Sequence, residues 1–166
     1  MRPILTLLIL LFYSALSAQP TVVEPSSFAF SNGVHPTFIC IFEGTDAKYV
    51  ESYWKDELKK ISATVSTKKE VIGHAALVPQ VSGDTVRVYV KAEQRKNSPN
   101  LTAHVAILTT TGFVGPNSDP QAFDGAKDFV QQRSTALRRQ LAEQELSLAE
   151  RGLSRMKKEL SDLQRD

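Results

Sequence analysis

The side chains best suited to bind a metal ion are three histidines, His35, His74 and His104. His74 and His104 lie in predicted strands, so their imidazoles would meet only if those strands were neighbours in the right register. A zinc site would also need a third ligand and groups that orient the ligands. None of the usual short ligand spacings occurs in the sequence. We therefore predict no metal site and no cofactor, and expect these histidines to be ordinary sheet or surface residues.

Nucleophiles with a recognisable activating partner are also missing from the sequence. Cys40 is the only cysteine, so no intramolecular disulfide can form, and it lies in an apolar run without a neighbouring base. No serine occupies a G-x-S-x-G turn, and no glycine-rich phosphate loop is present. Acidic residues such as Glu143, Glu145 and Glu150 lie on a predicted helix, where exposed carboxylates mostly add solubility. We predict no catalytic residues and a protein that is not an enzyme.

The charge balance excludes a strong nucleic-acid binder. The chain carries 20 Lys and Arg against 18 Asp and Glu, a formal net charge of +2. Phosphate backbones require a more concentrated positive field than this. The basic segment from Lys59-Lys60 to Lys68-Lys69 is predicted to be a solvated loop. The alternative is a contact with an anionic envelope surface, helped by Arg138-Arg139 if they lie nearby.

Residues 1–18 have the pattern of a secretory signal peptide. Arg2 supplies the positive charge, an apolar core follows, and small residues lead to cleavage after Ala18 or after Ser17. The apolar core is too short for a stable membrane anchor, and no second hydrophobic span follows. We expect an exported protein, periplasmic or secreted, with no transmembrane anchor. The lack of disulfides slightly favours a periplasm.

The strand pattern predicts one sheet within residues 37–117. Residues 19–36 form either an extended lead-in segment or a first hairpin around Asn32-Gly33. Thr37–Glu43 is apolar on both faces, which indicates a central strand. Three further strands are expected at Val71–Val78, Thr85–Glu93 and Leu101–Thr110. Valines alternate with polar residues and Tyr89 in the second of these, which predicts one buried and one solvated face.

Two helices complete the predicted fold. The first carries an apolar stripe at helical spacing, formed by Val50, Trp54, Leu58 and Ile61, with Thr45 or Asp46 as its cap. The second occupies residues 118–166 and begins at Ser118-Asp119-Pro120. The order β-α-β-β-β-α predicts an α+β domain with a curved antiparallel sheet of about four strands and helices on one face.

The distal part of the long helix has the apolar spacing of a coiled coil. We call its six apolar positions the seam; they are Leu146, Ala149, Leu153, Met156, Leu160 and Leu163. Their steps of three and four residues are those of a and d positions. A helix over residues 118–166 would be about 70 Å long, so its distal half must project, pair with another helix or fold back onto the domain. Gly125 and Gly152 each cost about 1 kcal/mol relative to alanine and are candidate bends.

Three short segments resemble a set of uncharacterised exported proteins of Bacteroidota. They are Tyr53–Lys60 in the first helix, Val86–Lys91 in the alternating strand, and Gly112-Phe113 before the charged C-terminal helix. The resemblance implies an exported α+β domain with a helical tail. It implies no activity and no functional residues.

Two functional hypotheses follow. The first is an exported, non-enzymatic binding or assembly module of the cell envelope, in which the C-terminal helix is the interaction element. It would form a weak homo-oligomer or bind another envelope protein, because six seam positions over less than three heptads are few. The alternative is a small-ligand-binding or hydrolytic domain with a cleft between the sheet and the helices.

Overall fold

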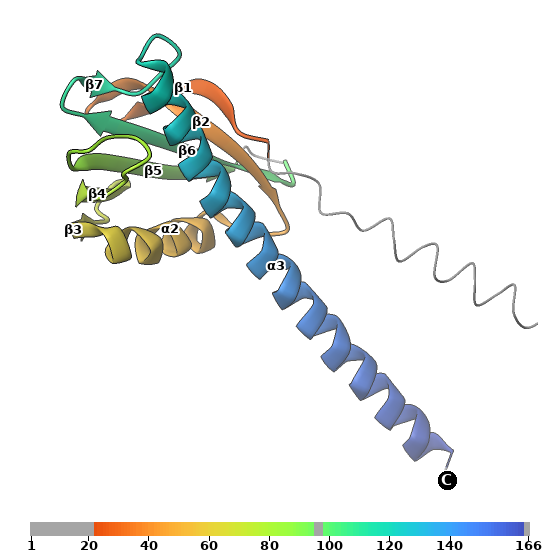
Figure 1. Cartoon of the computed structure of the whole chain (residues 1–166). Helices are drawn as coiled ribbons and strands as arrows, with labels where there is room; N and C mark the ends of the chain where they lie inside the picture. The colour runs from red at the N-terminus through yellow and green to blue at the C-terminus, as the bar shows by residue number, and fades with distance from the viewer. Residues whose placement is uncertain (1–21, 95–97, 165–166) are drawn as a thin grey trace, which may run out of the picture.

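The computed structural model describes residues 22–94 and 98–164, which form an open antiparallel sheet with two helices on one of its faces (Figure 1). The strands are β1 (Glu24–Phe30), β2 (Gly33–Glu43), β3 (Ser62–Ser66), β4 (Val71–Ala76), β5 (Val86–Gln94), β6 (Asn100–Thr109) and β7 (Gly112–Phe113). The helices are α2 (Ala47–Ile61) and α3 (Pro120–Leu163).

The sheet has the strand order β1-β2-β6-β5-β4-β3, with β7 paired to the end of β6. The prediction of an α+β fold with an antiparallel sheet and a long C-terminal helix is confirmed. The predicted count of about four strands and the order β-α-β-β-β-α are wrong, because the described residues form a 7-stranded sheet. Two strands precede α2, and β3 starts directly where α2 ends, at Ser62, with no turn residue between them.

The first two strands form a hairpin that curls the sheet. Phe30 pairs with Gly33 across a two-residue turn at Ser31 and Asn32. Gly33 has a φ of 129°, a conformation that costs glycine little. β2 is therefore second from one edge, and its outward-facing Ile41 is exposed while Phe38, Cys40 and Phe42 are buried.

Helix α2 forms as its spacing predicts. The Asp46 side chain accepts a hydrogen bond of 2.8 Å from the Tyr49 backbone N–H, which caps the first turn. Val50, Trp54 and Leu58 are fully buried on one side of the helix. Full burial of an apolar side chain of this size contributes roughly 2–3 kcal/mol, so this stripe fixes α2 against the sheet.

Helix α3 runs without interruption for 44 residues, or about 66 Å. The Asp119 side chain accepts a hydrogen bond of 3.0 Å from the Ala122 N–H at its start. Its first half packs on the same face of the sheet as α2, and the rings of Trp54 and Phe129 lie 6.2 Å apart. Neither Gly125 nor Gly152 breaks the helix.

A second, smaller core lies on the opposite face of the sheet. Phe30, Tyr89 and Ala106 are buried there. The expectation of a solvated face for Tyr89 is wrong, because the curl of the sheet carries β1 over it. The ring of Phe28 in β1 stacks on His104 in β6 with centroids 4.1 Å apart, although β2 lies between these strands.

Candidate interaction surface

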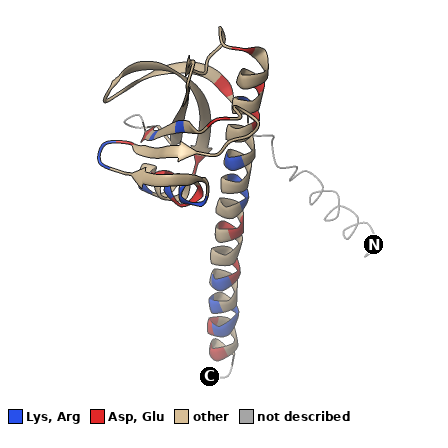
Figure 2. Ribbon diagram, turned by 60° about the vertical axis from the view of Figure 1, so that its left-hand side comes forward, with Lys and Arg blue, Asp and Glu red and all other residues tan. Residues whose placement is uncertain are grey.

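The root of the distal helix is held by contacts that end at Leu141. The Arg138 side chain donates a hydrogen bond of 2.7 Å to the backbone oxygen of Ile41. Gln140 donates one of 2.9 Å to the Tyr49 hydroxyl, and Leu141 packs partly buried against the core. Beyond this point α3 leaves the domain and projects (Figures 1 and 2). The projecting part, residues 142–163, is about 33 Å long.

The seam lies entirely on the projecting part and is exposed. The exposed fractions of its large side chains run from 51% at Leu153 to 74% at Leu163, with Leu146, Met156 and Leu160 between them. Ala149 is exposed as well. The helix therefore takes the projecting alternative, and its own domain does not cover the seam as the fold-back alternative would require.

The seam does not continue the face of α3 that packs on the domain. At 100° per residue, the seam is centred about 130° around the helix axis from the side that carries Ala126, Val130 and Leu137. Leu148, by contrast, continues the packed face and is 66% exposed. The two apolar faces of α3 are thus separate, and a partner on the seam need not displace the domain.

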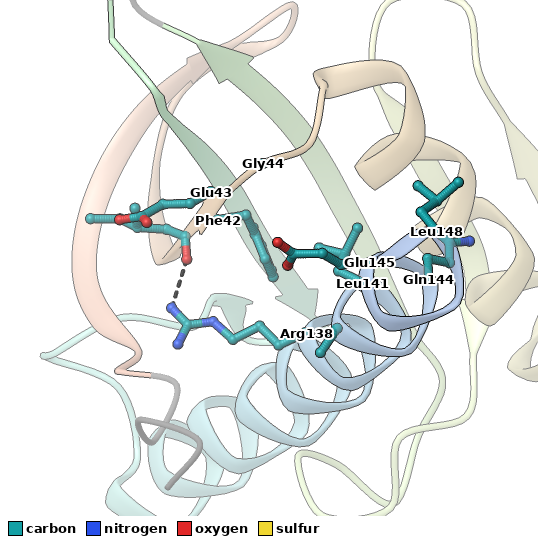
Figure 3. Close-up of a pocket in the computed structure, with 10 residues that line it drawn as sticks. Phe42, Glu43, Gly44, Arg138, Leu141, Gln144, Glu145 and Leu148 are labelled. Atoms are coloured by element: carbon teal, nitrogen blue, oxygen red, sulfur yellow. Dashed lines mark hydrogen bonds between the residues drawn. The ribbon is translucent and has the colours of Figure 1, made fainter. Parts of the chain in front are cut away.

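A groove of about 540 Å³ separates the root of the helix from the end of β2 (Figure 3). Its lining residues are Ile41, Phe42, Glu43, Gly44, Arg138, Leu141, Ala142, Gln144, Glu145 and Leu148. Arg138 spans the groove, with its guanidinium bonded to Ile41 and 5.9 Å from the ring centroid of Phe42. No serine, cysteine or histidine is among the lining residues, so the groove offers a binding surface but no nucleophile of these types.

The histidines do not converge. β5 separates the strands of His74 and His104. His74 lies 3.2 Å from the Ser66 hydroxyl, and His35 lies 3.1 Å from the Asn32 side-chain oxygen and stacks on Phe113. Within residues 22–94 and 98–164, no group of three or more His, Cys, Asp or Glu side chains could hold a metal ion.

His104 is a buried titratable group at the second core. It is buried against Phe28, and neither ring nitrogen has a hydrogen-bond partner among the described residues. Its Nε2 lies 3.7 Å from a Glu93 carboxylate oxygen. Burial lowers the pKa of His104, and the Glu93 carboxylate offsets part of this shift. This position beside the second core makes the burial of His104 a contribution to the stability of the fold.

Cys40 is a buried core residue. Ser134 on α3 donates a hydrogen bond of 3.0 Å to its sulfur. Burial raises the pKa of the thiol to about 11, an effect that the Ser134 hydrogen bond and the Arg138 charge only partly oppose. The thiolate needed for nucleophilic chemistry is therefore scarce at neutral pH.

The basic segment is divided between α2 and the β3–β4 turn. Lys59 and Lys60 close α2, while Lys68 and Lys69 lie in the turn after β3. β3 and β4 lie at one edge of the sheet. Arg138 contacts β2, near the other edge, so Arg138 does not extend this basic segment. Among the described residues, no helix combines the length and the apolarity that a membrane crossing requires.

No family model matches this chain, and no curated protein or solved structure matches it either. Its function must therefore be inferred from its own surface, on which the seam is the largest group of exposed apolar side chains among the described residues.

Proposed function

We propose that the chain is an exported, non-enzymatic binding or assembly module of the cell envelope. The domain is the head, and α3 beyond Leu141 is the interaction element. The observation that carries this proposal is the exposed seam, a regular a/d stripe on a rigid projecting helix. A solvated helix without a partner has no need of leucine or methionine at these spacings.

The energetics favour a weak or domain-assisted association. Burying the exposed parts of the five large seam side chains would contribute about 1–2 kcal/mol each, or about 5–10 kcal/mol together. Association costs about 4–15 kcal/mol in lost translational and rotational freedom. The seam alone therefore supports modest affinity, which suits an assembly that forms at high local concentration in an envelope compartment.

Export is supported by the signal-peptide pattern of residues 1–18, which lie outside the described residues. The resemblance to exported proteins of Bacteroidota agrees with it. Mass spectrometry of the protein from the exported fraction should give a mature N-terminus at Gln19, or at Ala18 if cleavage follows Ser17. A chain that retains Met1 and stays in the cytoplasm would contradict the localisation.

The interaction element is tested by a truncation that spares the core. Leu137 is fully buried and Leu141 packs on the core, so the cut belongs after Gln144. The full chain and the chain ending at Gln144 are used as baits for envelope proteins and for a differently tagged copy of the same chain. We expect the truncated form to remain folded and to lose its partners.

A matched pair of substitutions distinguishes binding through the seam from nonspecific hydrophobic binding by the helix. Leu153→Gln changes a seam residue, whereas Leu148→Gln makes the same chemical change on the packed face of the same helix, at a side chain at least as exposed. Leu153→Gln should reduce recovery of the partner several-fold, and Leu148→Gln should not. Equal recovery by the two variants, or by the truncated chain, would refute the seam as the interaction element.

The groove at the helix root supports a second candidate function, binding of a small ligand. It combines apolar walls from Phe42, Leu141 and Leu148 with the carboxylates of Glu43 and Glu145. A compound that occupies it should raise the thermal midpoint of the full chain. That rise in the thermal midpoint should be lost in Leu148→Gln and kept in Leu153→Gln. The reverse result would show that the groove is not the binding site.

A further inference from the structure

We infer that the seam binds the seam of a second copy of this chain in an antiparallel arrangement. The inference rests on the proposed function and names its partner and geometry. It follows from two independent features of the projecting helix: the sizes of the residues along the seam, and the charges beside it. Both distinguish the antiparallel pairing from the parallel one.

The seam residues fit each other in the antiparallel direction. Leu146, Leu153 and Leu160 occupy a positions, and Ala149, Met156 and Leu163 occupy d positions. When two copies run antiparallel, each a position packs in a layer with a d position. With full overlap, Leu146 meets the partner's Leu163, Leu153 meets the partner's Met156, and Ala149 meets the partner's Leu160. Every small residue then faces a large one.

The parallel direction leaves a gap. In register, each residue packs against its own copy, so Ala149 would meet the partner's Ala149. Two alanines in one layer leave a space between helices held apart by leucines on both sides, and such voids lose contact energy. The chain has one alanine among its six seam positions, and only the antiparallel pairing places a leucine opposite it.

The flanking charges favour the same direction. In the antiparallel pair, e positions face e positions, so Glu150 lies beside the partner's Lys157, and this contact occurs twice. In the parallel pair, g positions face e positions, so Glu145 lies beside the partner's Glu150, again twice. Each exposed pair contributes only a few tenths of a kcal/mol. Among the residues that the structure describes, the sign nevertheless differs, with two attractions in one arrangement and two repulsions in the other.

The domain leaves room for this arrangement. Leu163, the last helical residue, would reach Leu146 of the other copy, which is five residues beyond Leu141, where the domain ends its contact with α3. Because the seam is centred about 130° from the packed face, the second helix approaches on a side that the domain does not cover. The two heads then lie at opposite ends of the helix pair, with their Leu141 residues about 40 Å apart along the axis.

One substitution should change the dimer dissociation constant in opposite directions for the antiparallel and the parallel pair. Glu150→Lys places a positive charge beside the partner's Lys157 in the antiparallel pair but beside the partner's Glu145 in the parallel pair. We expect the dimer dissociation constant from sedimentation equilibrium to rise about fivefold at low salt, because two attractive pairs become repulsive. Adding Lys157→Glu should restore the original value. A fall in the constant for Glu150→Lys alone would overturn the antiparallel arrangement.

Three serines allow a direct distance measurement. Ser147, Ser154 and Ser161 all occupy b positions one heptad apart, and each can be replaced by a spin-labelled cysteine of similar size. In the antiparallel pair, the axial offset between copies is about 2 Å at position 154 and about 20 Å at positions 147 and 161. Dipolar spectroscopy should give the shortest distance at 154. The unsubstituted chain is the labelling control, because Cys40 is buried.

Each outcome is decisive. Distances that run long, short, long along the helix support the inference, and equal distances at the three positions indicate a parallel pair and overturn it. A chain that stays monomeric at millimolar concentration also overturns it. If that monomer still recovers a different envelope protein in a Leu153-dependent way, the proposed function survives while the self-association fails.

Discussion

Replacement of Gly125 by alanine should destabilise the domain, whereas the same replacement at Gly152 should stabilise the helix. Both glycines lie inside α3, and alanine gains about 1 kcal/mol over glycine in a helix interior. Helix propensity alone would therefore make both changes favourable. The surroundings of the two positions predict opposite signs.

At Gly125 the helix approaches the segment after β4 at backbone distance. A Cβ there would lie 1.8 Å from the carbonyl oxygen of Gln80 and 2.6 Å from its carbonyl carbon. The loop cannot easily retreat, because Val78 and Val81 are buried and the Val81 N–H donates to the Val78 oxygen at 2.9 Å. Overpacking of this kind costs about 1–3 kcal/mol, occasionally more.

The expected net effect follows from these two contributions. A clash of about 3 kcal/mol less a helix gain of about 1 kcal/mol leaves Gly125→Ala about 2 kcal/mol less stable. For a chain of this size the thermal midpoint should fall by about 4–8 °C. At Gly152 nothing lies within 4 Å of the added carbon, so Gly152→Ala keeps the favourable term and should raise the helix content.

Trp54 provides the assay for the domain. It is the only tryptophan and is fully buried against Phe129 of α3, so its fluorescence reports unfolding of the core. Far-ultraviolet circular dichroism reports the projecting helix. If Gly125→Ala unfolds at the wild-type midpoint or above it, the close approach of α3 to Gln80 is refuted. If Gly125→Ala fails to fold while Gly152→Ala folds normally, that result would also agree with the predicted loss of domain stability.

Three further predictions concern buried groups. Burial lowers the pKa of His104 below 6.5, so the unfolded chain binds the imidazole proton more readily than the folded chain. Stability should therefore fall as the pH drops below about 6.5. His104→Phe should flatten this part of the plot of urea midpoint against pH. Cys40, with its pKa raised to about 11, should resist thiol reagents at pH 8 in the folded protein and react fully in denaturant. Arg133→Met should cost about 1 kcal/mol in urea unfolding, because the largely buried Glu57 loses one of its two charged partners and keeps only Lys60, whereas Arg139→Met on the exposed helix should leave the midpoint unchanged.

The elements with strong local signals were predictable. Asp46 and Asp119 cap the two helices at the expected positions, and the apolar stripe through Trp54 faces the core. β5 covers Val86–Gln94, within one residue of the expected strand, because its alternation is unbroken. In these segments one periodicity dominates, so the local pattern and the tertiary fold agree.

The elements that depend on distant neighbours were not predictable. β3 has only five residues, two of them serine, and follows a helix without a turn, so it lacks the usual boundary signals. The burial of Tyr89 depends on the curl that brings Phe30 across the sheet, which no local alternation encodes. In the sequence, Gly125 appears only as a residue that weakens a helix. The close approach that requires a glycine there is to Gln80, which lies 45 positions earlier. The apolar spacing predicts the seam. It does not predict whether the domain covers the seam, because a projecting helix and a folded-back helix have the same spacing.

The packed half of α3 explains how its projecting half can be a binding element at all. An isolated helix of about 20 residues is marginal in water, since the first turn must be nucleated at a high entropic cost. Here the domain supplies that nucleus: residues 120–141 are fixed by buried contacts and by Arg138 and Gln140, and the helix continues from them without a break. The proposed partner would therefore meet a seam whose backbone is already ordered, and the ordering cost that would otherwise weaken binding would be offset within the fold. For this reason the proposed association would need only a short seam with an alanine and modest charges on this helix, while the same residues in a disordered tail would not suffice.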